Sequence, residues 1–221
     1  MKKTLISLCT VLILTSASGA SLVVGNTGPG HDINGFPFGG TSFGLGTRYQ
    51  QAYAASDFSA IGGPFAITGI SFLGGGSGNL APSTYSLYFS TVTAGIDTLS
   101  NVNFDSNRGP DNALFATVAL SGPAPPTLTF SGTPFNYDPT HGNLLLDIVV
   151  SPGGTGVFGA AFMSNTNAVG VFSRYHNFGT ANVGFGLVTE FAYVVPEPSV
   201  AGLIGLALLL GTFLRPVRFK L

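Results

Sequence analysis

Leu144-Leu145-Leu146-Asp147-Ile148-Val149-Val150 is the stretch of sequence that decides the fold. Leu144, Leu146, Ile148 and Val150 stand two residues apart and therefore share one face of an extended chain, with Asp147 on the opposite face. This alternation predicts a β-strand that turns one face toward a hydrophobic core and the other toward a polar environment.

The same period of two recurs elsewhere in the chain. The clearest cases are Thr84–Ser90 with Tyr85, Leu87 and Phe89 aligned, Leu114–Leu120 with Leu114, Ala116, Val118 and Leu120 aligned, and Leu187–Val195 with Leu187, Thr189, Phe191 and Tyr193 aligned. Weaker candidates are Ile67–Leu73, Thr127–Phe130, Gly159–Met163 and Val169–Tyr175. Clusters of turn-forming residues separate these stretches, namely Gly74–Gly78, Gly122–Pro126, Ser131–Pro134, Ser151–Gly156 and Asn165–Asn167. Several short strands with no helical stretch between them predict an all-β fold.

We expect residues 21–195 to form one domain, an antiparallel β-sandwich with a jelly-roll-like arrangement. Gly39–Gly46 is expected to be a loop. The domain has three arginines, no lysine and eight carboxylates, which gives a net charge of −5. Nucleic-acid binding requires clustered lysine and arginine, so this composition argues against a nucleic-acid partner.

Residues 1–20 have the pattern of a secretory signal peptide. Lys2 and Lys3 form a basic end, and Leu5–Leu14 is an apolar stretch too short for a permanent anchor. Small residues precede position 21, so we expect cleavage between Ala20 and Ser21. The single cysteine of the chain, Cys9, would leave with the signal peptide, so the mature chain would contain neither disulfides nor a thiolate.

Residues 196–221 combine three parts: Pro196-Glu197-Pro198, an apolar run from Val200 to Leu214, and a basic end with Arg215, Arg218 and Lys220. The two prolines exclude the tripeptide from a helix or a central strand, so it should be extended and exposed. At ~1.5 Å per residue the apolar run spans about 22 Å as a helix, somewhat less than the ~30 Å hydrocarbon core. The basic end predicts a cytoplasmic tail and a body on the other side of the membrane.

This order of parts resembles the PEP-CTERM sorting signal of Gram-negative bacteria, although the basic end is more dilute than a tight arginine cluster. The resemblance implies that a membrane protease, exosortase, cuts near Pro196-Glu197-Pro198 and passes the protein to the cell surface. The body is similar to a recurrent extracellular domain of PEP-CTERM proteins at Arg48–Tyr53, Ile67–Phe72, Tyr85–Leu87, Thr133–Pro139 and Gly142–Ile148. The resemblance supplies location and architecture but no catalytic residue.

The sequence gives only weak indications of catalytic or metal-binding residues. His31, His141 and His176 are far apart in the sequence, whereas a zinc site needs converging ligands, usually with a close pair. Asp105–Asp111 has oxygen-bearing side chains at alternate positions, as calcium loops do, but it lacks the closing glutamate. We therefore favour a turn there and leave calcium open.

Other patterns also favour structural roles. Gly74–Gly78 contains a glycine-serine-glycine pattern, but the helix that a nucleophile elbow must open is missing. Glu190 is the single glutamate of the body, which makes a glycosidase carboxylate pair improbable. The aromatic residues near the N-terminus suggest core and loop packing rather than a sugar-binding face: Phe36, Phe38, Phe43, Tyr49 and Tyr53.

The sequence therefore predicts a non-catalytic protein without cofactor or metal. We expect an exported precursor, anchored transiently in the inner membrane and facing the periplasm, that reaches the cell surface or extracellular matrix. Its expected partners are exosortase and, in the matrix, exopolysaccharide. The alternatives are a secreted module that binds glycan or ice on a flat sheet face, and a hydrolase that acts on polysaccharide.

Overall fold

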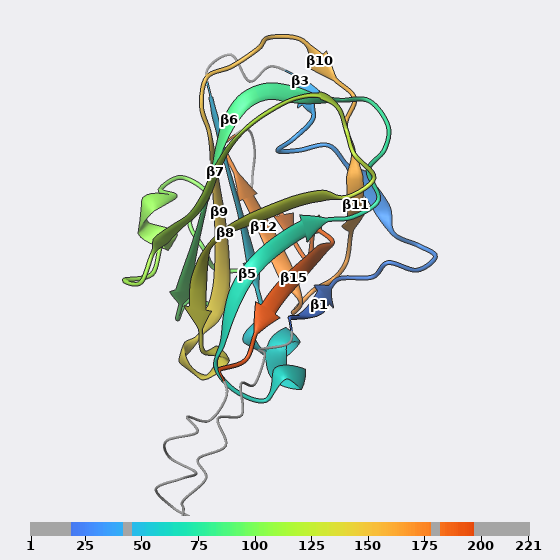
Figure 1. The fold of residues 1–221 in the computed structure, drawn as a ribbon. Helices are drawn as coiled ribbons and strands as arrows, with labels where there is room; N and C mark the ends of the chain where they lie inside the picture. Colours follow the sequence, from blue (N-terminus) through green and yellow to red (C-terminus); the bar gives the residue numbers. More distant parts are fainter. Residues whose placement is uncertain (1–18, 42–45, 178–181, 197–221) are drawn as a thin grey trace, which may run out of the picture.

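A computed structural model describes residues 19–41, 46–177 and 182–196 of the chain. These residues fold into β-sheets in which every strand pair is antiparallel (Figure 1). The predicted all-β, antiparallel class is confirmed. No helix within the described ranges is long and apolar enough to cross a membrane.

Two large sheets carry most of the fold. One has the order β1 (Ala20–Val24), β15 (Thr189–Val194), β5 (Phe65–Phe72) and β8 (Leu128–Tyr137). The other has the order β13 (Asn182–Val183), β12 (Phe172–His176), β4 (Thr47–Tyr53), β9 (Asn143–Val150), β6 (Asn79–Val92) and β7 (Ala113–Pro123).

Two smaller sheets and three short helices complete the described structure. The sheets are β14 (Gly186–Leu187), β11 (Phe162–Asn165) and β2 (Asp32–Asn34), and β10 (Val157–Phe158) with β3 (Gly40–Thr41). The helices are of the 3₁₀ type: η1 (Ala55–Ile61), η2 (Asp105–Asn107) and η3 (Pro139–His141).

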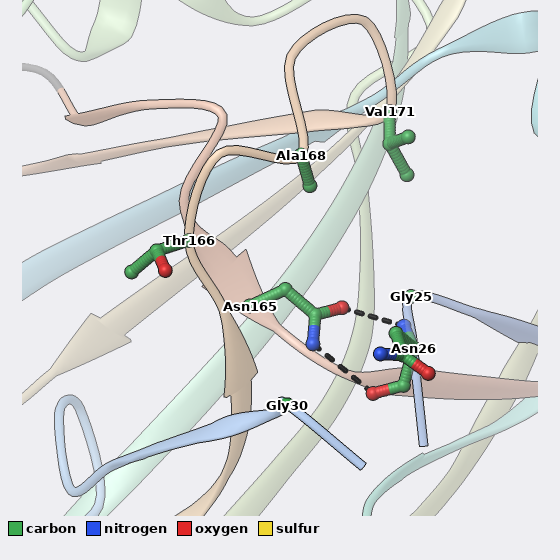
Figure 2. Close-up of a pocket in the computed structure, with 7 residues that line it drawn as sticks. All are labelled: Gly25, Asn26, Gly30, Asn165, Thr166, Ala168 and Val171. Carbon is green, nitrogen blue, oxygen red and sulfur yellow. Dashed lines mark hydrogen bonds between the residues drawn. The ribbon is translucent and has the colours of Figure 1, made fainter. Parts of the chain in front are cut away.

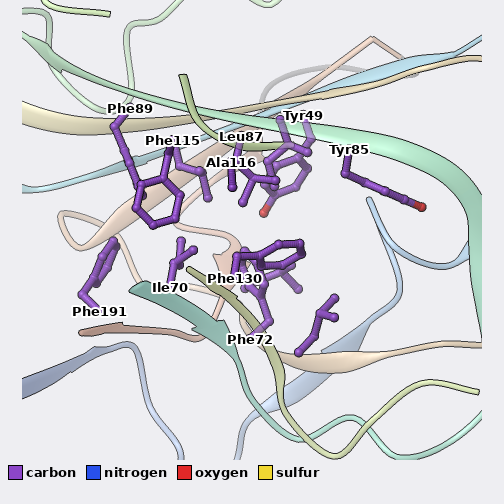
Figure 3. Close-up of a cluster of buried hydrophobic side chains, with 14 of the residues drawn as sticks. Tyr49, Ile70, Phe72, Tyr85, Leu87, Phe89, Phe115, Ala116, Phe130 and Phe191 are labelled. Atoms are coloured by element: carbon purple, nitrogen blue, oxygen red, sulfur yellow. The ribbon is translucent and has the colours of Figure 1, made fainter. Parts of the chain in front are cut away.

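The main core lies between the two large sheets and is rich in aromatic rings (Figure 3). Phe89 from β6 meets Phe135 from β8 and Phe191 from β15 at ring-centroid distances of 5.7 and 6.4 Å. Tyr53 from β4 meets Phe191 edge-on at 5.0 Å. Each contact joins one sheet to the other, so phenylalanine packing holds the two layers together.

Strand β9 is buried on both faces. Leu144, Leu146 and Ile148 point into the main core, as their alternation predicts, and all three are fully buried. Leu145 and Asp147 point to the opposite face, and they too are buried. The cover on that side is the long connection between β6 and β7, which contributes to a second apolar cluster: Ala52, Ala54, Val92, Ile96, Leu99, Phe104, Leu145 and Tyr175.

At one edge the two sheets approach each other closely. Strands β7 and β8 are consecutive in the chain and belong to different large sheets. A Cβ atom placed on Gly132 would lie 2.0 Å from the carbonyl oxygen of Phe115, so only glycine allows β8 to pass β7 at this point. This contact brings the sheet edges together on the side of β7 and β8.

Most of the strongly alternating stretches form the expected strands. Tyr85, Leu87 and Phe89 are fully buried in β6, and Leu187, Thr189 and Phe191 are fully buried on either side of the break between β14 and β15. The weaker candidates Ile67–Leu73 and Val169–Tyr175 correspond to β5 and β12, and Gly159–Met163 overlaps the start of β11.

Three sequence-based expectations are wrong in detail. Leu114 does not share the inward face of β7, because Phe115 is an extra residue at a bulge and takes the buried position, which leaves Leu114 49% exposed. Ser131–Pro134, expected as a turn, lies inside β8. Gly39–Gly46 was expected to be a loop, but Gly40 and Thr41 form β3; residues 42–45 lie outside the described ranges.

Leu146→Ala tests the assignment of the core. The fully buried leucine contacts both sheets through the main core, so we expect the free energy of unfolding to fall by about 2–5 kcal/mol. Leu114→Ala is the matched control, and a much smaller loss is expected because this side chain is already half exposed. Urea denaturation followed by circular dichroism measures both changes, and equal losses would contradict the assignment.

Candidate functional site

The two described ends of the body lie side by side. Ala20, the first residue of β1, pairs with Tyr193 near the end of β15, and Val194 pairs with Ala66 on the other side. Ala20 and Ser21 are exposed at the outer edge of the sheet, and Pro196 is exposed just beyond it. The chain therefore enters and leaves the body at neighbouring positions of one sheet (Figure 1).

Only part of the predicted sorting and cleavage site falls within the described residues. The structure places Ala20, Ser21 and Pro196, and it brings them to the same end of the four-stranded sheet. The remaining predicted residues lie outside the described ranges: Glu197, Pro198, Val200, Leu214, Arg215, Arg218 and Lys220. The expected signal peptide likewise lies outside, apart from Gly19 and Ala20.

The helices η1 and η3 lie at this same end. Helix η1 leads directly into β5, and Phe58 anchors it by packing on Phe65, Tyr137 and Phe191 at centroid distances of 5.2–5.7 Å. Between the two helices is a hollow of about 350 Å³, lined by Ala55, Ser56, Phe58, Ser59, Gly62, Gly63, Pro139 and Thr140. Its lining is mostly apolar and contains no ionisable side chain. The lining residues therefore supply no acid, base or ion-pairing group.

Asp57 on η1 lies between the lining residues Ser56 and Phe58 and has an unusual environment. Its Oδ2 atom is buried and has no hydrogen-bond partner among the described residues. Burial raises the pKa of Asp57 from 3.8 to about 6, partly offset by a backbone hydrogen bond at Ala54. A raised pKa means that the folded state holds the Asp57 proton more tightly than the unfolded chain does.

Asp57→Asn is expected to change how stability depends on pH. As pH rises from about 4 to 6, ionisation of the buried Asp57 lowers the stability of the wild-type protein. Asparagine does not ionise, so the stability of the variant relative to wild type should be highest at pH 7 and lowest at pH 4. Thermal unfolding at both pH values measures this difference.

Asp138→Asn is the matched control for this test, with the opposite sign. Thr140 hydrogen bonds lower the pKa of Asp138, so its ionised form stabilises the folded state above pH 3.8, and that stability is lost as pH falls through the lowered pKa. Asp138→Asn should therefore be less stable than wild type at pH 7. If the difference in thermal stability between Asp57→Asn and wild type is the same at pH 4 and pH 7, the raised pKa assigned to Asp57 is wrong.

A cluster of charged residues lies on the outer face of the six-stranded sheet. Arg48 from β4 donates from Nε and Nη2 to the two oxygens of Asp147 on β9, at 2.9 and 2.6 Å. Arg108 donates from Nε to the same carboxylate at 2.7 Å. Arg48 donates a third hydrogen bond, from Nη1 to Asp105 Oδ1, at 2.8 Å. The guanidinium of Arg108 also stacks over the ring of Tyr88, 4.8 Å from its centroid.

This cluster fastens the long β6–β7 connection to the sheet. Asp147 is 1% exposed and is neutralised by two guanidinium groups, one from the sheet and one from the connection. Hydrogen bonds to Arg48 lower the pKa of Asp105, which keeps this exposed carboxylate ionised. A buried carboxylate with all its partners supplied by the protein is a structural clamp rather than a reactive group.

The Asp105–Asp111 segment uses its oxygen-bearing side chains within the protein. Asp111 Oδ1 accepts a hydrogen bond from the backbone N–H of Thr91 at 2.8 Å, and Asn107 bonds Gln50 and the backbone of Ser100. Asp105 bonds Arg48. In each of these three side chains at least one oxygen is thus engaged in a contact within the protein.

Asp147→Asn measures the strength of the clamp. Removing the shared carboxylate charge leaves two arginines without their buried partner, so the free energy of unfolding should fall by about 3–5 kcal/mol. Asp105→Asn removes an exposed carboxylate from the same arginines and should cost far less. Urea denaturation compares the two variants, and a loss for Asp147→Asn no larger than for Asp105→Asn would contradict the clamp.

The three histidines contact different parts of the protein. His31 Nδ1 lies 2.9 Å from the carbonyl oxygen of Gly28, His141 lies 3.8 Å from Asp138, and the His176 ring packs on Phe36 at 5.2 Å. Within the described ranges, no three histidine, cysteine or acidic side chains come together as metal ligands. Of the aromatic residues considered for sugar binding, Phe38, Tyr49 and Tyr53 are fully buried, and Phe43 lies outside the described ranges.

The remaining candidates for chemistry are dispersed. Gly74–Gly78 leads into strand β6 rather than a helix, so it has no elbow geometry. Glu190 lies on the outer face of β15, opposite Val23 and Ser71. Neither position brings a second carboxylate or a base within hydrogen-bonding distance in the described part of the chain.

A hollow of about 430 Å³ was missed by the sequence reasoning (Figure 2). The Asn165 side chain lies at its centre, accepting from the backbone N–H of Asn26 at 2.6 Å and donating to its carbonyl oxygen at 3.0 Å. The lining consists of Gly25, Asn26, Gly30, Asn165, Thr166, Ala168 and Val171. The amide of Asn165 joins the end of β11 to the loop that follows β1, so its role is structural.

Comparison of the chain with family models, curated proteins and solved structures finds no match.

Proposed function

We propose that this chain is a non-catalytic surface protein of the PEP-CTERM type, exported by its N-terminal signal and sorted by exosortase through Pro196-Glu197-Pro198. The observation that carries the proposal is the pairing of β1 with β15. It places Ser21, the expected first residue after signal-peptide cleavage, beside Ala192. The N-terminal cleavage point and Pro196 therefore lie at the same end of one sheet.

The position of the tripeptide relative to the sheet supports the same proposal. Val194 is the last residue with a ladder partner, and Pro196 is already exposed. From Val194 to Val200 an extended chain reaches about 20 Å, so the body would stand close to the membrane with the tripeptide in between. A protease that cuts extended backbone would meet its substrate where the sheet ends.

The fold also limits where the two cuts can fall. Residues 189–194 form a strand between β1 and β5, and their backbone is held in ladders on both sides. A protease active site needs the same backbone groups, so we propose that the sorting cut falls at Val195 or later. The bond between Ala20 and Ser21 lies within β1, so its cleavage would precede the pairing of β1 with β15.

The proposed role of the body follows from its surface and its lack of convergent chemistry. The jelly-roll-like sandwich carries few charges and no lysine, and its described carboxylates and histidines do not form a metal or acid–base cluster. We therefore assign the body to non-covalent association with exopolysaccharide in the matrix rather than to hydrolysis of it.

The mass of the mature protein tests this proposal. In a host with an exosortase system, surface-fraction protein should begin at Ser21 and end between Val195 and Ser199, because the backbone of β15 up to Val194 is held in the sheet. Changing Glu197 or both prolines should leave an uncut, membrane-retained form, and deleting Ser199–Leu221 should release the body to the periplasm. A surface species that still carries Val200–Leu221 would mean that the tail is a plain membrane anchor.

A further inference from the structure

The three arginines of the body differ in how their charge is balanced. Arg48 and Arg108 share Asp147 and Asp105, and both remain partly exposed. Arg174 on β12 is only 8% exposed, and no carboxylate lies within ion-pair distance of it in the described residues. The most buried cation of the body is thus the one without an anion.

Neutral groups surround Arg174. Its Nη1 donates to Asn34 Oδ1 at 3.0 Å and its Nη2 donates to Asn182 Oδ1 at 2.9 Å. The ring of Phe185 covers the guanidinium, 4.0 Å from its carbon to the ring centroid. The Nε atom is buried and has no hydrogen-bond acceptor among the described residues. In Arg48, by contrast, Nε and Nη2 together hold a carboxylate.

This arrangement is costly for a structural residue. Burying a charge without a counter-ion is unfavourable, and buried cations in proteins are usually paired. Burial lowers the pKa of Arg174, whereas the partners of Arg48 raise that of Arg48. The two asparagines hold the Nη groups of Arg174 in place, and Nε is the donor that still lacks an acceptor.

We propose that Arg174 is the binding site for one carboxylate group of an acidic glycan, held by its Nε–H and a neighbouring Nη–H. A singly charged planar group matches one guanidinium, and the fork of arginine fits a carboxylate with two parallel hydrogen bonds. The carboxylate site rests on the geometry above, whereas the choice of a glycan uronate as its source rests on the proposed matrix function.

The cover over Arg174 is slight. In the described part of the chain, strand β13 consists of Asn182 and Val183 and pairs with β12 at Ser173 and Arg174. Its Val183 is 48% exposed, and Asn182, which carries one of the two acceptors for Arg174, is only partly buried. Few buried contacts mean a small cost for local opening. Displacement of Asn182 would free Nη2 beside Nε, which is the pair of donors that a carboxylate needs.

The experiment measures thermal unfolding of the full chain in detergent with sodium acetate or sodium glucuronate, against sodium chloride at equal ionic strength and against neutral glucose. We expect both carboxylates, but neither chloride nor glucose, to raise the unfolding midpoint. Arg174→Gln should weaken the apparent affinity about tenfold or more, and Arg174→Lys should weaken it as well because the fork is lost.

Arg108→Gln is the matched control, since it removes an arginine that already has its carboxylate. Its baseline midpoint should fall, but its response to glucuronate should remain. Equal responses in wild type and Arg174→Gln, or no response beyond chloride in wild type, would overturn the proposal. A response to acetate but not to glucuronate would overturn the glycan assignment and leave both the carboxylate site and the sorting function standing.

A measurement without substitution at Arg174 guards against misfolding of the variants. In arginine-labelled wild-type protein, the Nε–H resonance of Arg174 should shift on addition of glucuronate, while those of Arg48 and Arg108 stay in place. Shifts of equal size at all three arginines would indicate a general ionic effect and would likewise overturn the proposal.

Discussion

Two-sided burial of β9 is the constraint on which the rest of the structure depends. One face of this strand meets the aromatic core between the sheets, and the other meets the β6–β7 connection. The inner face is purely apolar, whereas the outer face contains Asp147, which can be buried only because Arg48 and Arg108 bond it. The same carboxylate therefore positions β4, β9 and the connection relative to one another.

The parts of the fold that alternation reveals are those with one apolar face. Strands β6 and β9 have such faces, and their inward residues could be predicted from the sequence. Strand β4, at the centre of the six-stranded sheet, carries Gln50 and Gln51 instead and gives no apolar alternation. Both glutamines are fully buried because their amides bond Phe104, Asn107 and Leu187, which lie far away in the sequence. A local sequence pattern does not reveal buried polar side chains whose hydrogen-bond partners are distant in the sequence.

The charged residues show the same limit. Between residues 21 and 195 the sequence displays three arginines and an isolated Asp147. It does not show that two arginines converge on one carboxylate while the third is enclosed by asparagines, because those contacts depend on the strand order. The bulge at Phe115 is also not evident from the sequence. This one extra residue reverses which side of β7 is buried, and the residue types around it do not reveal the bulge.

The pairing of β1 with β15 has a consequence for how the molecule forms. Ala20 lies against Tyr193, so the first strand of the body has no sheet partner until the last strand exists. Contacts between distant parts of a chain form slowly, because a long loop must close before they bring any stabilisation. The four-stranded sheet is therefore complete only when residues 189–194 take their place between β1 and β5. Until then the aromatic core lacks Phe191, whose ring contacts Tyr53 and Phe89 of the opposite sheet.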